Sequence, residues 1–447
     1  MLEPVVRWAA DQANSGLTEH VTHHATRAIV DWVAATISGA DLPPARSLRA
    51  AVVDDRAGGG AHLIPSGTPV PLRTAALING AASHTTEVDD IFRDGVYHPG
   101  APTIAAALAA AEDRGVSGSQ LLTGVTIGYE IGNRIAAAVQ PSHYRFWHTT
   151  GTVGTIGAAA AVAGVLRLDP QRFTDAIGNA ATMAAGLQQA FRADAMSKPL
   201  HAGHAAEAGS LAALAASEGF TGAPDVLDGP AGFAAAMSEG TSFHEVFENL
   251  GDHFTITETT FKNHTCCGHT FAAIDAILML REQHALTPEQ VERIRVGTYQ
   301  AALEVAGNPA PTTAFEAKFS LPYTVAAALH LGSVRLGAFE AHQRDDPGLR
   351  TTLGKVTLEI DPRLDGAFPR QRGARVTVVT TTGEELVCER PTRRGDPELP
   401  LTDDELSEKF LELVGERLDP DRTNALLAGL WSLGEVQDLR TARPLSV

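Results

Sequence analysis

Histidines are the residues of this chain best suited to chemistry, and they are unevenly spread along it. Of the 17 histidines, ten lie between residues 84 and 269, and several of these stand in turn-like sequences beside Asp, Lys or Gly. Imidazole titrates close to neutral pH, so histidines brought together by the fold would suit proton transfer. Five short segments carry the candidate residues.

The first segment runs from His84 to Pro102. His98 precedes a proline, so we expect it at a non-helical bend just before a helix that begins near Pro102. Asp89 and Asp90 are close enough in sequence to orient or charge an imidazole. The alternative is a capped loop with solvated acidic side chains.

The second segment, residues 143–151, contains His148 followed by two threonines and a glycine, ahead of a helix rich in Gly and Ala. A titratable ring and several hydrogen-bond donors at a helix N-terminus would suit a carboxylate ligand. The alternative is a helix cap in which His148 packs on Trp147.

The third segment, residues 196–204, contains Lys198 before a proline and near small apolar residues. A partly buried lysine either acts as a base or anchors an anion. The alternative is a solvated lysine at a turn. His201 and His204 could share one helix face and hold a metal, but no HExxH-type arrangement supports this.

The fourth segment, residues 261–270, contains Cys266 and Cys267 between two histidines. This pattern raises a zinc site or a cysteine nucleophile as alternatives. Adjacent cysteines differ from the C-x₂-C spacing of zinc sites, and the chain has no second pair. In the fifth segment, Tyr323 follows a proline at the start of an apolar helix. Its phenol is either a hydroxyl of the core or a proton donor at a cleft.

Charge and composition narrow the function. The net charge of 35 − 53 = −18 argues against nucleic-acid and anionic-membrane partners. Three cysteines, two of them adjacent, give no disulfide framework and indicate a reducing compartment. We find no secretory leader, and the apolar runs are shorter than the roughly 20 residues of a membrane span. Motifs for dinucleotides, nucleoside triphosphates and serine hydrolases are absent from the sequence. We therefore expect a cytoplasmic protein that does acid–base chemistry on a small anion without an organic cofactor.

The elements that must position these residues change in type along the chain. Helical periodicity and Ala/Gly-rich faces predict a dense helical body up to about residue 237. Alternating patterns then predict strands at 291–299, 354–360, 375–381 and 385–389, with helices among them. This is an α+β unit with an antiparallel sheet. Thr402 to Glu405 forms a capping box that opens a final helix, which could pack back on the first body.

Six motifs occur in a fixed order: Asp-Asp…His-Pro, Gly-Tyr-Glu-Ile…Arg, Trp-His-Thr-Thr-Gly-Thr-Val-Gly, Ser-Lys-Pro-Leu-His-Ala-Gly, Phe-Lys…Cys-Cys-Gly-His-Thr and Lys-Phe-Ser-Leu-Pro-Tyr. Together they resemble the MmgE/PrpD family over residues 5–440. That family includes 2-methylcitrate dehydratase, cis-aconitate decarboxylase and iminodisuccinate epimerase. The resemblance implies a mainly α protein: an all-helical domain of residues 1–268 completed by 400–447, and an α+β lid domain of residues 269–399. It also implies a homodimer and catalysis without metal or organic cofactor.

The resemblance assigns site residues between body and lid, where a cleft is expected. It implies proton transfer by two histidines with an aspartate orienting one ring, substrate carboxylates bound by lysines, and a tyrosine that donates a proton or hydrogen bond. The catalytic candidates are His98, His148, Lys198, Tyr323 and Asp90, and the substrate-binding candidates are Asp89, Lys262 and His269.

The family's chemistries share one step, in which a proton leaves or returns to the carbon beside a carboxylate. We predict a lyase of 2-methylcitrate dehydratase type acting on a small di- or tricarboxylate. Alternatives within the family are an epimerase of the iminodisuccinate type and a cis-aconitate decarboxylase. Two others are a zinc or thiol enzyme and a non-catalytic binding module. The zinc or thiol enzyme would be built on Cys266, Cys267, His201, His204 and His269.

Overall fold

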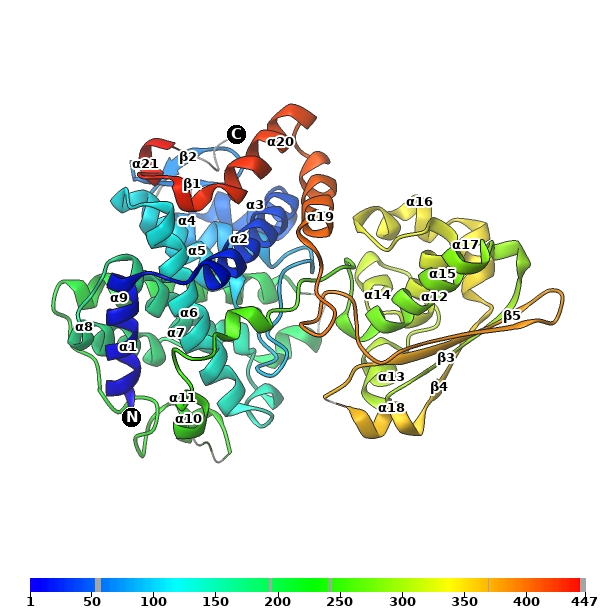
Figure 1. The fold of residues 1–447 in the computed structure, drawn as a ribbon, viewed down its shortest axis with the longest axis horizontal. Helices are drawn as coiled ribbons and strands as arrows, with labels where there is room; N and C mark the ends of the chain where they lie inside the picture. The colour runs from blue at the N-terminus through cyan, green and yellow to red at the C-terminus, as the bar shows by residue number, and fades with distance from the viewer. Residues whose placement is uncertain (53–57, 193–194, 240, 242, 369, 443–447) are drawn as a thin grey trace. The chain divides into compact units, whose positions relative to one another are not determined.

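The computed structural model describes residues 1–52, 58–192, 195–239, 241, 243–368 and 370–442. The chain divides into two compact units (Figure 1). The first unit consists of Met1–Thr260 and Thr402–Val447, and the second of Phe261–Leu401. The chain passes from the first unit to the second between residues 260 and 261, and back between residues 401 and 402. We had predicted domain boundaries at 268/269 and 399/400. The predicted fold class, mainly α with a smaller α+β part, is confirmed.

The first unit is built from helices that surround a buried centre. Among the described residues, α19, α20 and α21 of this unit come from the C-terminal part of the chain. The helices are α1 (Leu2–Ser15), α2 (Glu19–Gly39), α3 (Pro43–Ala51), α4 (Leu72–Ser83), α5 (Gly100–Arg114), α6 (Gly118–Val139), α7 (Thr149–Val165), α8 (Pro170–Thr182), α9 (Ser197–Ser217), α10 (Phe233–Met237), α11 (Phe243–Phe247), α19 (Asp403–Gly415), α20 (Pro420–Trp431) and α21 (Leu439–Ala442).

Helix α7 lies at the centre of this unit, packed against α5, α6, α8 and α9. All of its residues are buried. Small residues make this possible, because they let helix backbones approach closely. A Cβ on Gly128 of α6 would lie 2.7 Å from the Gly157 carbonyl oxygen, and one on Gly209 of α9 would lie 2.6 Å from the Thr155 carbonyl oxygen. The Ala/Gly-rich sequence thus gives a tightly packed body, as predicted.

We had expected the first unit to be all-helical, but it also contains a pair of strands. Strands β1 (Ala61–Leu63) and β2 (Thr68–Val70) form an antiparallel pair. Each strand has three residues, which is too short for an alternating pattern to show in the sequence. The pair is anchored by the backbone amide of His62, which donates to the carboxylate of Glu112 on α5 at 2.9 Å.

The second unit packs helices on a four-stranded sheet in the order β4-β3-β5-β6. Helix α12 packs against β5, β6 and α15, and together they form the core of this unit. The strands are β3 (Val291–Thr298), β4 (Val356–Ile360), β5 (Ala374–Thr380) and β6 (Glu385–Arg390). The helices are α12 (Phe271–His284), α13 (Gln300–Ala306), α14 (Ala314–Lys318), α15 (Leu321–Leu331), α16 (Ala341–Arg344), α17 (Pro347–Leu353) and α18 (Pro362–Ala367).

The sheet is mixed, which corrects our prediction of an antiparallel one. Strand β5 pairs antiparallel with both β3 and β6, but β3 and β4 run parallel. A long helical connection, residues 299–355, separates β3 from β4 and lets the chain return in the same direction. Alternating sequence patterns reveal strands but not the length of the path between them, so the parallel pair was missed.

The C-terminal segment is held to the first unit by a buried lysine. Thr402 and Glu405 form the predicted capping box at the start of α19. Lys409 of α19, 1% exposed, donates to Asp31 Oδ1 of α2 at 2.5 Å and to the Val88 carbonyl oxygen at 2.7 Å. A buried cation with these partners fixes α19 against α2 and also fixes the backbone that leads into Asp89.

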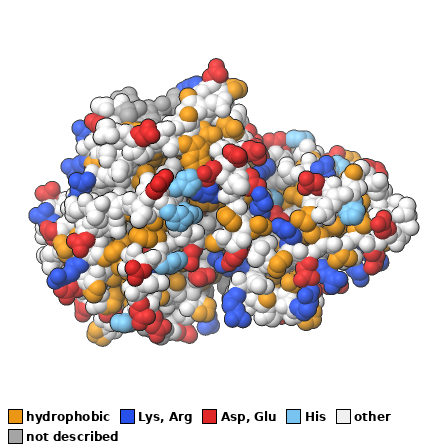
Figure 2. Space-filling model, viewed as in Figure 1, with side chains coloured by type: hydrophobic (Ala, Val, Ile, Leu, Met, Phe, Trp, Pro, Cys, Tyr) orange, Lys and Arg blue, Asp and Glu red, His pale blue; other side chains and the backbone are white. Residues whose placement is uncertain are grey.

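The surface carries both signs of charge. On the face drawn in Figure 2, acidic and basic side chains are interspersed rather than gathered in separate areas. Within the described ranges, no helix is both long enough and apolar enough to cross a membrane.

Candidate active site

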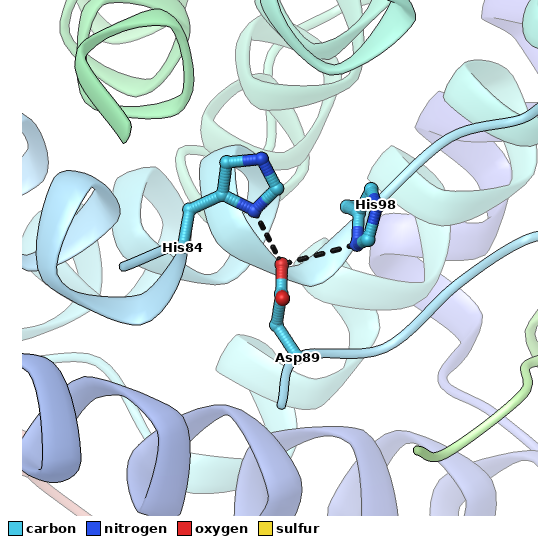
Figure 3. Close-up of side chains that lie close together, drawn as sticks. All are labelled: His84, Asp89 and His98. Carbon is cyan, nitrogen blue, oxygen red and sulfur yellow. Dashed lines mark hydrogen bonds and ion pairs between the residues drawn. The ribbon is translucent and has the colours of Figure 1, made fainter. Parts of the chain in front are cut away.

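The loop between α4 and α5 carries the first group of candidate residues. Helix α4 ends at Ser83, directly before His84, and α5 begins at Gly100, two residues after His98. Helices α4 and α5 pack against each other, so both ends of the loop are fixed. In Figure 3, His84 and His98 reach Asp89 from opposite ends of this loop.

Asp89 joins two imidazoles. His84 Nδ1 lies 2.6 Å from Asp89 Oδ2, and His98 Nδ1 lies 3.1 Å from the same oxygen (Figure 3). The two rings are 4.8 Å apart between centroids. His84 and Asp89 are buried, whereas 15% of the His98 side chain is exposed. The Asp89 carboxylate accepts a hydrogen bond from His84 Nδ1 and so holds a proton on that nitrogen, and it lies at ion-pair distance from His98 Nδ1.

These three residues also form a possible metal-binding group. Among the described residues, His84, Asp89 and His98 are the one group of three or more His, Cys, Asp or Glu side chains whose ligand atoms lie close enough together to share a metal ion. The 2.6 Å separation of His84 Nδ1 and Asp89 Oδ2 is a hydrogen-bond distance. Two ligands of one zinc ion, each about 2.0–2.2 Å from it, would stand further apart in a tetrahedral site. The geometry therefore fits an aspartate–histidine hydrogen bond better than a metal centre.

His148 comes from a distant part of the chain and lies on the same group. It is the N-cap of α7 and is 1% exposed. Its ring stacks on His84 with centroids 5.5 Å apart and an interplanar angle of 20°. Burial, helped by nearby His84 and Lys198, lowers the pKa of His148 well below its usual value. A neutral imidazole at physiological pH can take up a proton.

Lys198 supplies a positive charge beside these histidines. It lies in the first turn of α9, where its ammonium forms an ion pair with Glu87 Oε1. Each of these two side chains is 14% exposed, so the pair is largely buried, which agrees with the first of our two interpretations of the lysine. Lys198 Nζ also lies 5.5 Å from the centre of the Phe191 ring. Glu87 has a φ of 64°, in the left-handed region that non-glycine residues rarely adopt.

Asp90 has a different environment from Asp89. It accepts hydrogen bonds from the Tyr129 hydroxyl at 2.7 Å and from the Gly100 amide at 3.0 Å. Burial raises the pKa of Asp90 to about 8. We had placed Asp90 among the catalytic residues and Asp89 among those that bind substrate. The contacts instead put Asp89 on the imidazoles and Asp90 on the first amide of α5 and the Tyr129 hydroxyl.

Of the candidates in the second unit, His269 has a hydrogen-bond partner within that unit. Lys262 is 2% exposed. His269 Nδ1 lies 2.8 Å from the Tyr299 hydroxyl, and burial together with Arg372 and Arg393 lowers the pKa of His269 to about 3.

Tyr323 belongs to the core of the second unit. It is fully buried in α15, and its hydroxyl donates to the Ala338 carbonyl oxygen at 2.5 Å. This geometry favours the core hydroxyl, one of our two interpretations. We therefore leave Tyr323 out of the proposed catalytic group.

The cysteine segment has the character of a packed core. Cys266 is fully buried, its sulfur lies 3.2 Å from Thr270 Oγ1, and burial raises the pKa of its thiol to about 12. The thiolate, which acts as nucleophile and metal ligand, is therefore scarce at neutral pH. His201 belongs to the first unit, where it contacts His148 rather than a cysteine. These contacts do not support the zinc or thiol alternative.

Sequence reasoning missed three partners of the candidate site. His84 was noted only as the first residue of its segment, and Glu87 and Tyr129 were given no role. Their partners Lys198 and Asp90 are 111 and 39 residues away in the sequence. For His84 a signal existed, because it stands five residues before Asp89 in the same segment.

Comparison with known proteins agrees with this organisation. The MmgE/PrpD N-terminal domain matches residues 3–246, and the MmgE/PrpD C-terminal domain matches residues 264–433. The chain is 27% identical to the cis-aconitate decarboxylase-like protein oryM of Aspergillus oryzae, over 97% of this chain and 94% of that protein. It is 24% identical to a cis-aconitate decarboxylase of Aspergillus terreus, over 97% and 93% of the two chains. It is 29% identical to the human cis-aconitate decarboxylase, over 83% and 78%.

A two-unit chain with a histidine-rich site in its helical unit is thus matched over nearly its whole length. The protein belongs to the MmgE/PrpD family. It is an enzyme of the lyase type, as we predicted.

Proposed function

We propose that this enzyme decarboxylates cis-aconitate or a closely similar unsaturated tricarboxylate. The observation that carries the proposal is the group of imidazoles around Asp89, with the Lys198 ammonium beside it. Our sequence prediction put a dehydratase of the 2-methylcitrate type first. The names of three relatives matched over most of this chain now favour decarboxylation within the same family.

Decarboxylation of such a substrate needs one proton and several cations. Loss of CO₂ breaks a carbon–carbon bond, and the released electron pair moves through the neighbouring double bond to a carbon beside another carboxylate. That carbon must then take up a proton from the enzyme. The remaining carboxylates are anionic, so a positive charge near them stabilises both the bound substrate and the developing negative charge.

The contacts suggest a role in the reaction for each of these residues. His98 and His148 transfer the proton, and Asp89 holds His84 and His98 in place. Lys198 exchanges Glu87 for a substrate carboxylate, because the two carboxylates carry the same charge and the same oxygen acceptors. Lys262 and His269 remain predicted ligands of the substrate, and the homodimer remains a prediction for the assembly.

The test is proton NMR in D₂O with the purified full-length protein and a panel of cis-aconitate, citrate, 2-methylcitrate and iminodisuccinate. We expect cis-aconitate to lose CO₂ and to give a dicarboxylate that carries one deuterium at carbon. Water loss from 2-methylcitrate, or inversion of iminodisuccinate, without turnover of cis-aconitate would overturn the decarboxylase and favour one of the other family reactions.

A further inference from the structure

We propose that His201 is a positioning residue that determines which ring nitrogen of His148 carries a proton. The sequence suggested His201 only for a metal pair with His204 or for a zinc or thiol site, and the proposed reaction does not use it. The inference rests on the proposed function in one respect: it takes His148 to be a residue that transfers the proton.

The two rings are joined through like nitrogens. His148 Nδ1 lies 3.1 Å from His201 Nδ1, with ring centroids 5.3 Å apart. A hydrogen bond between two nitrogens of this kind contains one proton, so one ring donates and the other accepts. If His201 donates, neutral His148 carries its proton on Nε2 and can act as an acid there. If His148 donates, its Nε2 is bare and can act only as a base.

The surrounding backbone leaves room for His201 at this position. A Cβ on Gly151 would lie 3.1 Å from His201 Cβ, and one on Gly186 would lie 3.3 Å from His201 Nδ1. Gly186 has a φ of 141°, which other residues rarely adopt. Its carbonyl oxygen also accepts a hydrogen bond from the His148 amide at 2.9 Å. One glycine thus holds the backbone of His148 and makes space for the ring of His201.

Burial and the nearby positive charges keep both rings neutral. Burial lowers the pKa of His201 to about 4, with His84, His204 and Lys198 acting in the same direction. The pKa of His148 is lowered by burial and by His84, Lys198, His201 and His98. Between two neutral imidazoles, the hydrogen bond selects a tautomer instead of stabilising a charge. Since the proposed decarboxylation requires an acid, we expect His201 to be the donor and His148 to carry its proton on Nε2.

The direct test is nitrogen-15 NMR of the full-length protein labelled at histidine, without substrate. The His148 signals are assigned as those lost in His148→Gln. We expect His148 in the wild-type protein to be the Nε2–H tautomer. In His201→Leu, which removes the donor, we expect a mixture of tautomers or the opposite one. An unchanged His148 tautomer in folded His201→Leu would overturn the proposal.

Two further variants keep the test decisive. His201→Asn retains a hydrogen-bonding group near the Nδ1 position, so we expect it to preserve the wild-type tautomer even if His201→Leu does not fold. His204→Leu lies one turn along the same helix and serves as the matched control, with wild-type His148 signals expected. Loss of the tautomer in His204→Leu as well would show a general disturbance of α9 and contradict a specific role for His201.

Kinetics with cis-aconitate then test the consequence. We expect kcat of His201→Leu to fall about tenfold or more, within the range of acid–base catalysis, and KM to change less than about twofold. In His201→Asn, which keeps a hydrogen-bonding group beside His148 Nδ1, we expect kcat to recover. An equal loss in both variants would overturn the proposal. If the wild-type enzyme does not turn over cis-aconitate, the proposed function fails, while the NMR result still decides the inference.

Discussion

Two histidine-rich regions of this protein have similar composition and different contacts. In the first unit, His84 and His98 share the carboxylate of Asp89, and His148 stacks on His84. In the second unit, His264 and His269 each have a separate partner. His264 Nε2 lies 2.9 Å from Asp275, which also accepts the Arg394 amide, and His269 contacts the Tyr299 hydroxyl.

The comparison shows that the number of titratable residues in a segment does not locate the chemistry. In the second unit His264 is held by Asp275 and His269 by Tyr299, both of them buried residues, and Cys266 stays a thiol. In the first unit the rings lie on one another and on one carboxylate, and the His98 side chain reaches the surface of that unit. We therefore propose that the histidine group of the first unit is catalytic and that the Cys266 segment of the second unit has a structural role.

The largest contrast is expected between two aspartates that each hold a histidine. Asp89→Asn keeps the side-chain shape but removes the charge that orients His84 and His98. We expect kcat to fall about 100-fold or more, as for the loss of an acid–base partner. Asp275→Asn, the matched change beside His264, should alter kcat less than about threefold in protein that is still folded. Steady-state decarboxylation of both variants checks this, and equal losses would remove the distinction between the two regions.

A smaller effect is expected at the ion pair of the first region. Glu87→Gln removes the carboxylate that competes with substrate for Lys198, so KM should fall, by about threefold to tenfold for an ionic contact of 0.7–1.4 kcal/mol. Lys198→Met should raise KM instead. An increase of KM in Glu87→Gln would contradict the exchange of Glu87 for substrate.

Asp90 gives a prediction about stability against pH. Its pKa is raised from 3.8 to about 8 in the folded protein, so its contribution to stability is full below pH 3.8 and is lost as pH rises toward 8. Between pH 6 and 8, the wild type should lose on the order of 1–3 kcal/mol more than Asp90→Asn. Urea unfolding at the two pH values measures this difference. Parallel pH dependence in both proteins would contradict a raised pKa.

The smallest effect is expected at the cysteine segment. Cys266→Ala removes a buried thiol from the core, so it should cost about 1 kcal/mol of stability and change kcat less than about twofold. Thermal unfolding and steady-state kinetics check this variant. A loss of activity comparable to that of Asp89→Asn would restore the thiol enzyme as a serious alternative.

The sequence predicted the helices and strands well because periodicity and capping are local signals. It also pointed to His98, His148 and Lys198, which the fold brings together, and each stands beside a Pro or Thr that marks a turn or helix end. It could not decide between Asp89 and Asp90, because adjacent residues face different partners once the loop folds.

The remaining site features depend on contacts between distant residues. The pairing of His148 with His201 joins the start of α7 to α9, and that of Glu87 with Lys198 joins the loop after α4 to the same helix α9. The parallel pairing of β3 and β4 depends in the same way on the path of the chain between them. Such contacts leave no local pattern in the sequence.

The central claim is that the imidazoles around Asp89 deliver the proton in decarboxylation. The most direct test compares wild type with His148→Gln for deuterium incorporation from D₂O into the product of cis-aconitate. We predict one deuterium at carbon for each CO₂ released by the wild type, and a rate at least about 100-fold lower in the folded variant. Equal rates of incorporation by the two proteins would contradict the claim.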